Sequence, residues 1–294
     1  MVNLDAASDF MATHARLLDR RRFDVVVHSA PPGEVLAALA AYRNADGGYS
    51  WGLEPDLRAT ESQPGPALHA FEVFEDIAPA TTPQATELCA WLDSVALPDG
   101  GLPFALPVRS AAGCAPFWAN ADPTVSSLQI TAVVAANAHR VAAHDPAVAG
   151  QTWLSRATDY CFEAIAAKGD DWFALELAFS VQLLDAAHAT RPEAAALLTR
   201  LGERIPASGL VPVTGGIEGE TMRPLDFAPF PDGPARRLFA PDTIDADLDR
   251  LASGQEDDGG WRVDFASYSP AAELEWRGHM TVRAISILKR NGRL

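Results

Sequence analysis

Hydrophobic residues recur at helical spacing along most of the chain, and no stretch sustains the alternation that marks a β-strand. The clearest helical patterns occupy residues 36–40, 67–74, 88–95, 125–135 and 282–288. Alanine, the best helix former, is abundant in and around these stretches. The pattern predicts an all-α fold.

Three dipeptides combine a capping side chain with a proline at the first helical position. They are Thr82-Pro83, Asp122-Pro123 and Asp145-Pro146. Such pairs favour helix N-termini, because the side-chain oxygen accepts from a free backbone N–H and proline needs no partner there. We therefore expect a helix to begin at each.

A short turn rich in Asp and Gly recurs after the helical patterns. Asp46 and Asp99 of the first two copies are 53 residues apart, and Gly209 and Gly260 of the last two are 51 apart. A period near 50 residues accommodates two helices, and such pairs bury their apolar faces by stacking on neighbours. The sequence predicts about five to six helix pairs in one domain, residues 1–294, with a closed ring favoured over an open solenoid. The copies span residues 44–49, 98–102, 206–210 and 255–261, with a remnant at 168–172.

Residues 206–241 interrupt this pattern with seven prolines and five glycines. Apolar residues, including Phe227 and Phe230, are interleaved among them. We expect an ordered irregular loop that replaces one helix of a repeat.

The strongest turn, Gln-Glu-Asp-Asp-Gly-Gly-Trp at 255–261, resembles the QW repeat of squalene and oxidosqualene cyclases. Protein prenyltransferase β-subunits carry degenerate forms of this repeat, and residues 42–49 and 96–102 are similar degenerate copies. The resemblance covers about residues 35–105 and 195–290. It implies an α/α toroid, in which inner and outer rings of helices surround a central cavity that holds an isoprenoid or other hydrophobic substrate.

The net charge limits the partners we expect, and the cysteine content indicates a cellular location. The chain has 23 Lys and Arg against 39 Asp and Glu, a formal charge of −16. This balance argues against nucleic-acid binding, which needs clustered basic residues. No apolar run is long enough to predict a membrane span. Three widely separated cysteines favour a reducing, cytoplasmic location.

The catalytic signatures of the resembled families are incomplete. The Asp-x-Asp-Asp motif of proton-initiated cyclases is missing, and residues 245–249 come nearest to it on a predicted outer helix. His279 is similar to the zinc-binding His of prenyltransferases, but Asp226-Phe227-Ala228 lacks the ligand Cys. Without the thiolate a tetrahedral zinc site is not expected, so we predict no metal and no cofactor.

Polar and aromatic residues that follow the turns are the candidate site, because inner helices of a toroid begin there. Segments 51–58 and 273–277 each combine carboxylates with Trp and Arg, and ring closure would bring them together. The candidate acids and bases are Glu54, Asp56, Asp226 and Glu275. The candidate substrate-binding residues are Trp51, Arg58, Gln63, Trp118, Trp172, Phe227, Trp276, Arg277 and His279. A structural alternative is a closure salt bridge from Arg58 or Arg277 to a neighbouring acid.

The other histidines lack ligand spacing and are interpreted as surface or helix residues: His14, His28, His69, His139, His144 and His188.

Three functions fit these observations. The leading hypothesis is an enzyme that binds a small isoprenoid-like molecule and uses a carboxylate as general acid or base. A second is a toroid without catalysis that binds a lipid or a protein. A third is a carbohydrate-active α/α-barrel enzyme, in which paired acids cleave a glycosidic bond beside tryptophan platforms.

Overall fold

The computed structural model describes residues 2–294, and these residues are predominantly helical. The all-α prediction is confirmed, because the only strands in this range are a two-residue antiparallel pair. The helices are α1 (Leu4–His14), α2 (Leu17–His28), α3 (Pro32–Ala40), α4 (Pro64–Asp76), α5 (Pro83–Val95), α6 (Pro116–Ala119), α7 (Leu128–Ala142), α8 (Pro146–Ala149), α9 (Thr152–Ala167), α10 (Ala174–Ala187), α11 (Ala194–Gly202), α12 (Pro224–Phe227), α13 (Pro241–Ser253) and α14 (Pro270–Arg290). Strands β1 (Val211–Pro212) and β2 (Thr221–Met222) and the 3-10 helix η1 (Pro234–Leu238) complete the fold.

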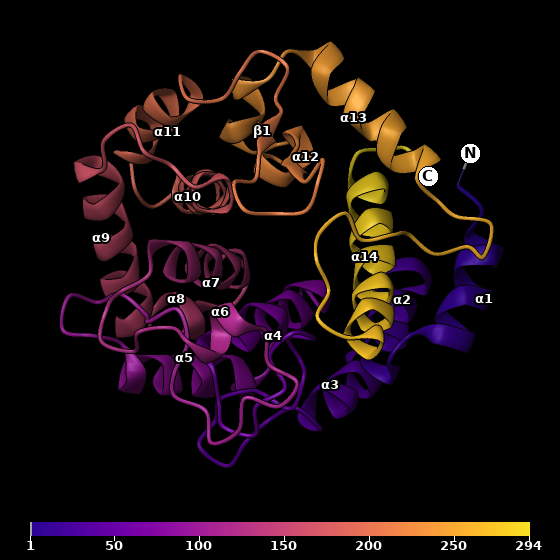
Figure 1. Cartoon of the computed structure of the whole chain (residues 1–294), viewed down its shortest axis with the longest axis horizontal. Helices are drawn as coiled ribbons and strands as arrows, with labels where there is room; N and C mark the ends of the chain where they lie inside the picture. The colour runs from indigo at the N-terminus through magenta and orange to yellow at the C-terminus, as the bar shows by residue number, and fades with distance from the viewer. Residues whose placement is uncertain (1) are drawn as a thin grey trace.

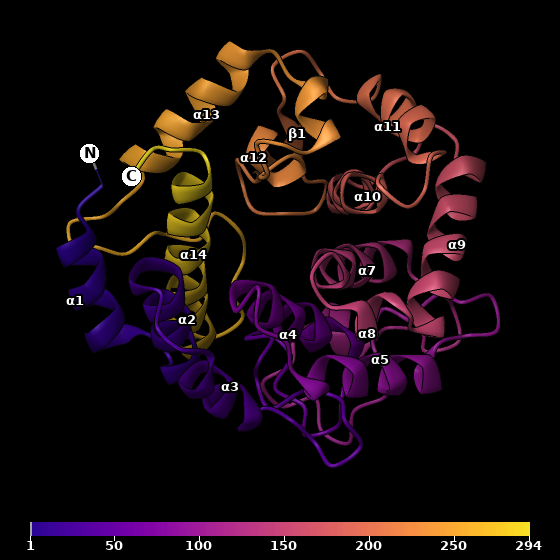
Figure 2. The same cartoon turned by 180° about the vertical axis from the view of Figure 1, so that it is seen from behind.

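The helices form two layers around a common centre (Figures 1 and 2). Helices α4, α7, α10 and α14 lie inside, whereas α3, α5, α9, α11 and α13 lie at the periphery. Helix α7 packs between α4 and α10, and α14 packs against α1, α2 and α13. The first and last helices of the chain therefore meet.

Three of the predicted repeat turns share one backbone geometry. In each, an Asp side chain accepts from the backbone N–H of the second glycine, at 2.9 to 3.1 Å. The first glycine has φ of 91° or 92°, in the region that favours glycine. Residues 206–210 have a positive φ at Gly209 but lack this Asp. The matching residues are Asp46, Gly47 and Gly48; Asp99, Gly100 and Gly101; and Asp258, Gly259 and Gly260.

The last of these turns is joined to the start of the chain by Gln255. Its Oε1 accepts from the backbone N–H of Asn3 at 2.7 Å, and its Nε2 donates to the Asn3 carbonyl at 2.8 Å. Asn3 caps α1 by accepting from the backbone N–H of Ala6. The glutamine of the turn thus binds exposed backbone at a helix end.

Two of the three predicted helix starts are confirmed. Thr82 and Asp145 cap α5 and α8, each with proline at the first helical position. The prediction at Asp122-Pro123 is wrong, since Asp122 accepts from the backbone N–H and the hydroxyl of Thr124 inside a turn. Helix α7 instead begins after Ser127, whose hydroxyl accepts from the N–H of Ile130.

The C-terminal helix begins earlier than its hydrophobic pattern indicated. Ser269 caps it, and Pro270 occupies its first position. Segment 273–277 and His279 therefore lie within α14. The proline-rich region 206–241 is ordered around β1, β2, α12 and η1. None of the helices in residues 2–294 combines the length and apolar character needed to cross a bilayer.

Candidate functional site

A cavity of about 650 Å³ lies among the inner helices and is bordered by the irregular segment that contains β2 and α12. Its volume is in the range of sites for small organic ligands. Helices α4, α7, α10 and α14 all contribute to its wall. The apolar part of the wall is formed by Leu68, Phe104, Phe117, Trp118, Ile130, Val133, Phe173, Leu175, Phe179, Met222, Phe230, Phe265, Met280 and Ile287.

Six of the residues singled out from the sequence line this cavity: Glu54, Asp56, Trp118, Asp226, Trp276 and His279. The expected meeting of segments 51–58 and 273–277 also occurs. The Trp276 Nε1–H donates to Asp56 Oδ2 at 2.8 Å, across 220 positions of sequence.

Two predicted residues form the closure salt bridge considered from the sequence. Arg58 donates from Nη2 to Glu275 Oε2, and neither side chain lines the cavity. Arg277 pairs with Asp258 at 2.8 Å and lies over the ring of Phe10. These contacts join the first and last parts of the chain.

Four other predicted residues also lie outside the cavity wall. Gln63 bonds the backbone of Leu106 through both its oxygen and its nitrogen. Trp51 is 52% exposed on the surface, and Trp172 lies beside the ammonium of Lys168. Phe227 is fully buried in the core.

Asp56 is the buried carboxylate at the edge of the aromatic wall. It accepts from the backbone N–H of Tyr268 at 2.9 Å and from Trp276, and no cation forms an ion pair with it among the described residues. Burial raises the pKa of Asp56, while these two N–H donors oppose the rise. Such a group is suited to exchange a proton with a molecule in the cavity.

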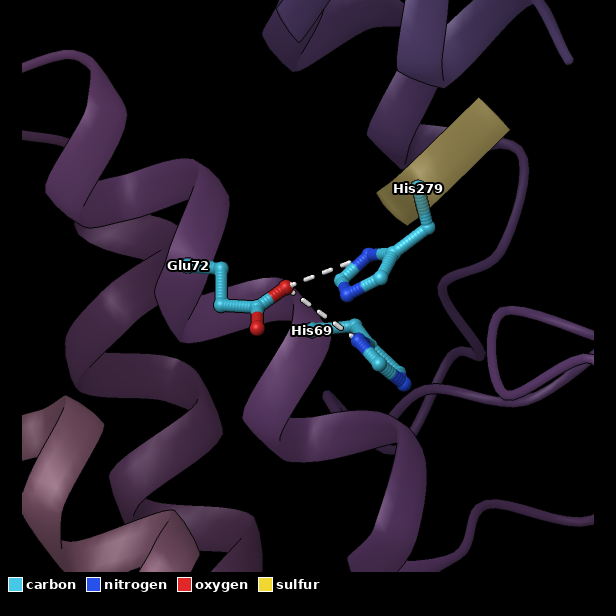
Figure 3. A group of neighbouring side chains, drawn as sticks. All are labelled: His69, Glu72 and His279. Carbon is cyan, nitrogen blue, oxygen red and sulfur yellow. Dashed lines mark hydrogen bonds and ion pairs between the residues drawn. The ribbon is translucent and has the colours of Figure 1, made fainter. Parts of the chain in front are cut away.

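Next to Asp56 is a cluster that the sequence did not reveal, centred on His69 of α4. Its Nε2 lies 3.2 Å from Glu54 Oε2, and its Nδ1 lies 3.2 Å from Glu72 Oε2. The same Glu72 oxygen is 3.7 Å from Nδ1 of His279 on α14 (Figure 3). We interpreted His69 as an ordinary helix residue. Its partner Glu72, three positions later on the same helical face, was the only local signal of this cluster.

The two imidazoles of this cluster have opposite protonation preferences. Burial works against the charge on His69, but the carboxylates of Glu72 and Glu54 raise its pKa to about 9. Burial lowers the pKa of His279 to about 3. At neutral pH, His69 is an imidazolium between two carboxylates, and His279 is neutral.

Arg22 of α2 completes the cluster. Its Nη1 lies 3.1 Å from Glu72 Oε2 and 3.3 Å from His279 Nδ1, and its Nε donates to Asp76 at 2.8 Å. One ligand atom from each of His69, Glu72 and His279 lies within 4.8 Å of the others, close enough to suggest a metal site. However, Arg22 already donates to Glu72 Oε2 and to His279 Nδ1. The Nδ1 lone pair of His279 cannot accept this hydrogen bond and bind a metal ion at the same time. The arrangement favours proton chemistry.

Comparison with known proteins adds no assignment: no protein-family model matches the chain, and no curated protein is similar to it.

Proposed function

We propose that this protein is an α/α toroid of the terpenoid cyclase and prenyltransferase type. The proposed ligand is an isoprenoid-like or other hydrophobic small molecule in the central cavity. Support comes from the two helix layers, the meeting of the first and last helices, and the shared geometry of three repeat turns. The aromatic and aliphatic wall of the cavity supplies the surface for an apolar ligand.

In this proposal Asp56 is the acid–base residue. The observation that carries it is the position of this buried carboxylate, which reaches the cavity beside Trp276 and Phe265 without an ion-pair partner. Glu54 fixes the local backbone by accepting from the Asp56 N–H at 3.2 Å, and His69 holds the other oxygen of Glu54. Asp56 would therefore exchange a proton with the substrate from a fixed position.

Substitution Asp56→Asn tests the proposal, because it removes the ionisable group at nearly constant shape. We expect conversion of the substrate to fall by about 100-fold or more, the usual contribution of a positioned acid or base. Binding of the same substrate should change little. The measurement is product analysis by mass spectrometry after incubation with squalene, farnesol, farnesyl diphosphate and a panel of neutral and uronic oligosaccharides.

Glu275→Gln is the matched control, since its carboxylate pairs with Arg58 outside the cavity wall. This variant should convert substrate at close to the original rate. Turnover of an oligosaccharide instead of a prenyl compound would contradict the proposal and favour a carbohydrate-active enzyme. Prenyl binding without turnover would instead favour a non-catalytic lipid-binding toroid.

A further inference from the structure

Arg140, near the end of α7, contributes a guanidinium to the cavity wall that has only neutral partners. Its Nη1 donates to Asn137 Oδ1 at 2.8 Å, and its Nη2 donates to Gln182 Oε1 at 3.3 Å. In the part of the chain that the structure describes, no carboxylate oxygen lies within 4.0 Å of its nitrogens. Both amide partners also line the cavity.

The other arginines of the cavity wall each have an acidic partner. Arg283 pairs with Asp226 at 2.8 Å, and Arg290 pairs with Glu75 at 2.7 Å. Arg22 pairs with Asp76, as described above. Arg140 therefore differs from its neighbours in lacking an ion-pair partner.

The guanidinium of Arg140 is held in place by an aromatic ring as well as by its two hydrogen bonds. Its guanidinium carbon lies 4.4 Å from the ring centroid of Phe230, and that of Arg290 lies 4.7 Å from the same centroid. The ring thus contacts both cations by cation–π interactions. A guanidinium held in place in this way presents its planar N–H donors with little further loss of conformational entropy on binding.

A partly buried charge without an ion-pair partner is costly in the unliganded protein. Burial accordingly lowers the pKa of Arg140 from its ordinary value, against the attraction of Glu75 and Asp185. Groups that reduce stability in this way commonly serve a ligand. An anionic group of a ligand in the cavity would supply the ion-pair partner that Arg140 lacks.

We infer that the ligand of the cavity carries a single terminal carboxylate, which binds Arg140 while its apolar chain lies along the aromatic wall. One guanidinium without an ion-pair partner matches one negative charge, and its planar fork suits a carboxylate. A diphosphate would bring several negative charges close to Glu75 and Asp226, which line the same cavity. This inference rests on the proposed function, since it names the substrate class of that site.

Three probes with the same chain and different head groups test the inference: farnesoic acid, farnesol and farnesyl diphosphate. Their dissociation constants are measured by isothermal titration calorimetry on the full chain. We expect the acid to bind at least about tenfold more tightly than the alcohol, as for a hydrogen bond to a charged group, and more tightly than the diphosphate. In Arg140→Gln the preference for the acid over the alcohol should disappear.

The stability of unliganded Arg140→Gln provides a second readout. Because the substitution removes a partly buried charge that has no ion-pair partner, its melting temperature should equal or exceed that of the original protein. Arg156→Gln is the control, because Arg156 pairs with Asp93 on the surface and lies outside the cavity wall. It should leave the head-group preference intact.

Failure of the carboxylate inference can be distinguished from failure of the proposed function. If acid and alcohol bind equally, if the diphosphate binds most tightly, or if Arg140→Gln keeps the preference, the carboxylate inference is overturned while the hydrophobic cavity stands. A large loss of stability in Arg140→Gln would also overturn it, by showing a structural role. If none of the three probes binds, the proposed function fails and the inference fails with it.

Discussion

Gly259→Ala should destabilise the folded chain by at least about 3 kcal/mol, by combining backbone strain with overpacking. Gly259 has φ of 91°, which alanine adopts only under strain. A Cβ built there would lie 2.0 Å from the carbonyl oxygen of Ala6 and 2.9 Å from the backbone nitrogen of Ala7. Both obstacles are backbone atoms of α1, so no side-chain rotation relieves them. The turn and the first helix would have to separate.

Gly292→Ala separates the two contributions. Gly292 also has a positive φ, 66°, but a Cβ there meets no atom within 4 Å. Its substitution should therefore cost only the strain, about 1 kcal/mol. Urea denaturation of the original chain and both variants gives the two differences in unfolding free energy. Equal losses in the two variants would contradict the prediction, by showing that the clash of the added Cβ with α1 has no measurable cost.

The fold could be predicted where local chemistry decides it. Helix spacing gave the all-α class, and the Asp-Gly-Gly turns have the same geometry wherever an Asp precedes two glycines. The predicted helix start at Asp122 is wrong because the side-chain oxygen of an Asp can either cap a helix or accept hydrogen bonds within a turn. In the structure it bonds Thr124 in a turn. The sequence alone does not distinguish these uses.

Only part of the candidate site could be predicted, because local patterns do not show which distant side chains the fold brings together. Glu54, Asp56 and Trp276 stood out because they lie in segments rich in charge and aromatic character. His69 did not, because only one of its two carboxylate partners, Glu72, lies on the same helix, whereas Glu54 lies in a loop 15 positions earlier. Arg140 was missed because its significance is the absence of an ion-pair partner. That property depends on which side chains the fold brings near it, and no local pattern encodes it.

The two imidazoles of the cavity cluster predict an unusual dependence of stability on pH. Between pH 6.5 and 9 the folded state holds a proton on His69 that the unfolded state has released, so stability falls as pH rises. The rise in pKa from 6.5 to about 9 corresponds to a loss of about 3 kcal/mol across this window. His279 acts with the opposite sign. Its pKa of about 3 makes stability rise with pH between 3 and 6.5.

Below pH 6.5 another group opposes the contribution of His279. Burial raises the pKa of Asp76 to about 6, so between its ordinary value of 3.8 and 6 the folded state binds the extra proton. Stability due to Asp76 therefore falls with rising pH and offsets part of the gain from His279. Between pH 6.5 and 9 the effect of His69 is easier to isolate. Burial raises the pKa of the Cys89 thiol from its ordinary value of 9 to about 12, so this thiol affects stability only above pH 9.

The substitution His69→Gln tests whether the fall in stability between pH 6.5 and 9 comes from His69. The variant keeps a side chain able to hydrogen-bond but cannot hold the proton, so its unfolding free energy should vary little from pH 6.5 to 9. His139→Gln is the control, because burial lowers the pKa of His139 to about 4 and it titrates outside this window. That variant should retain the fall, as measured by urea denaturation at pH 6.5, 7.5 and 9. An unchanged fall in His69→Gln would mean that the carboxylates of Glu54 and Glu72 do not hold a proton on His69.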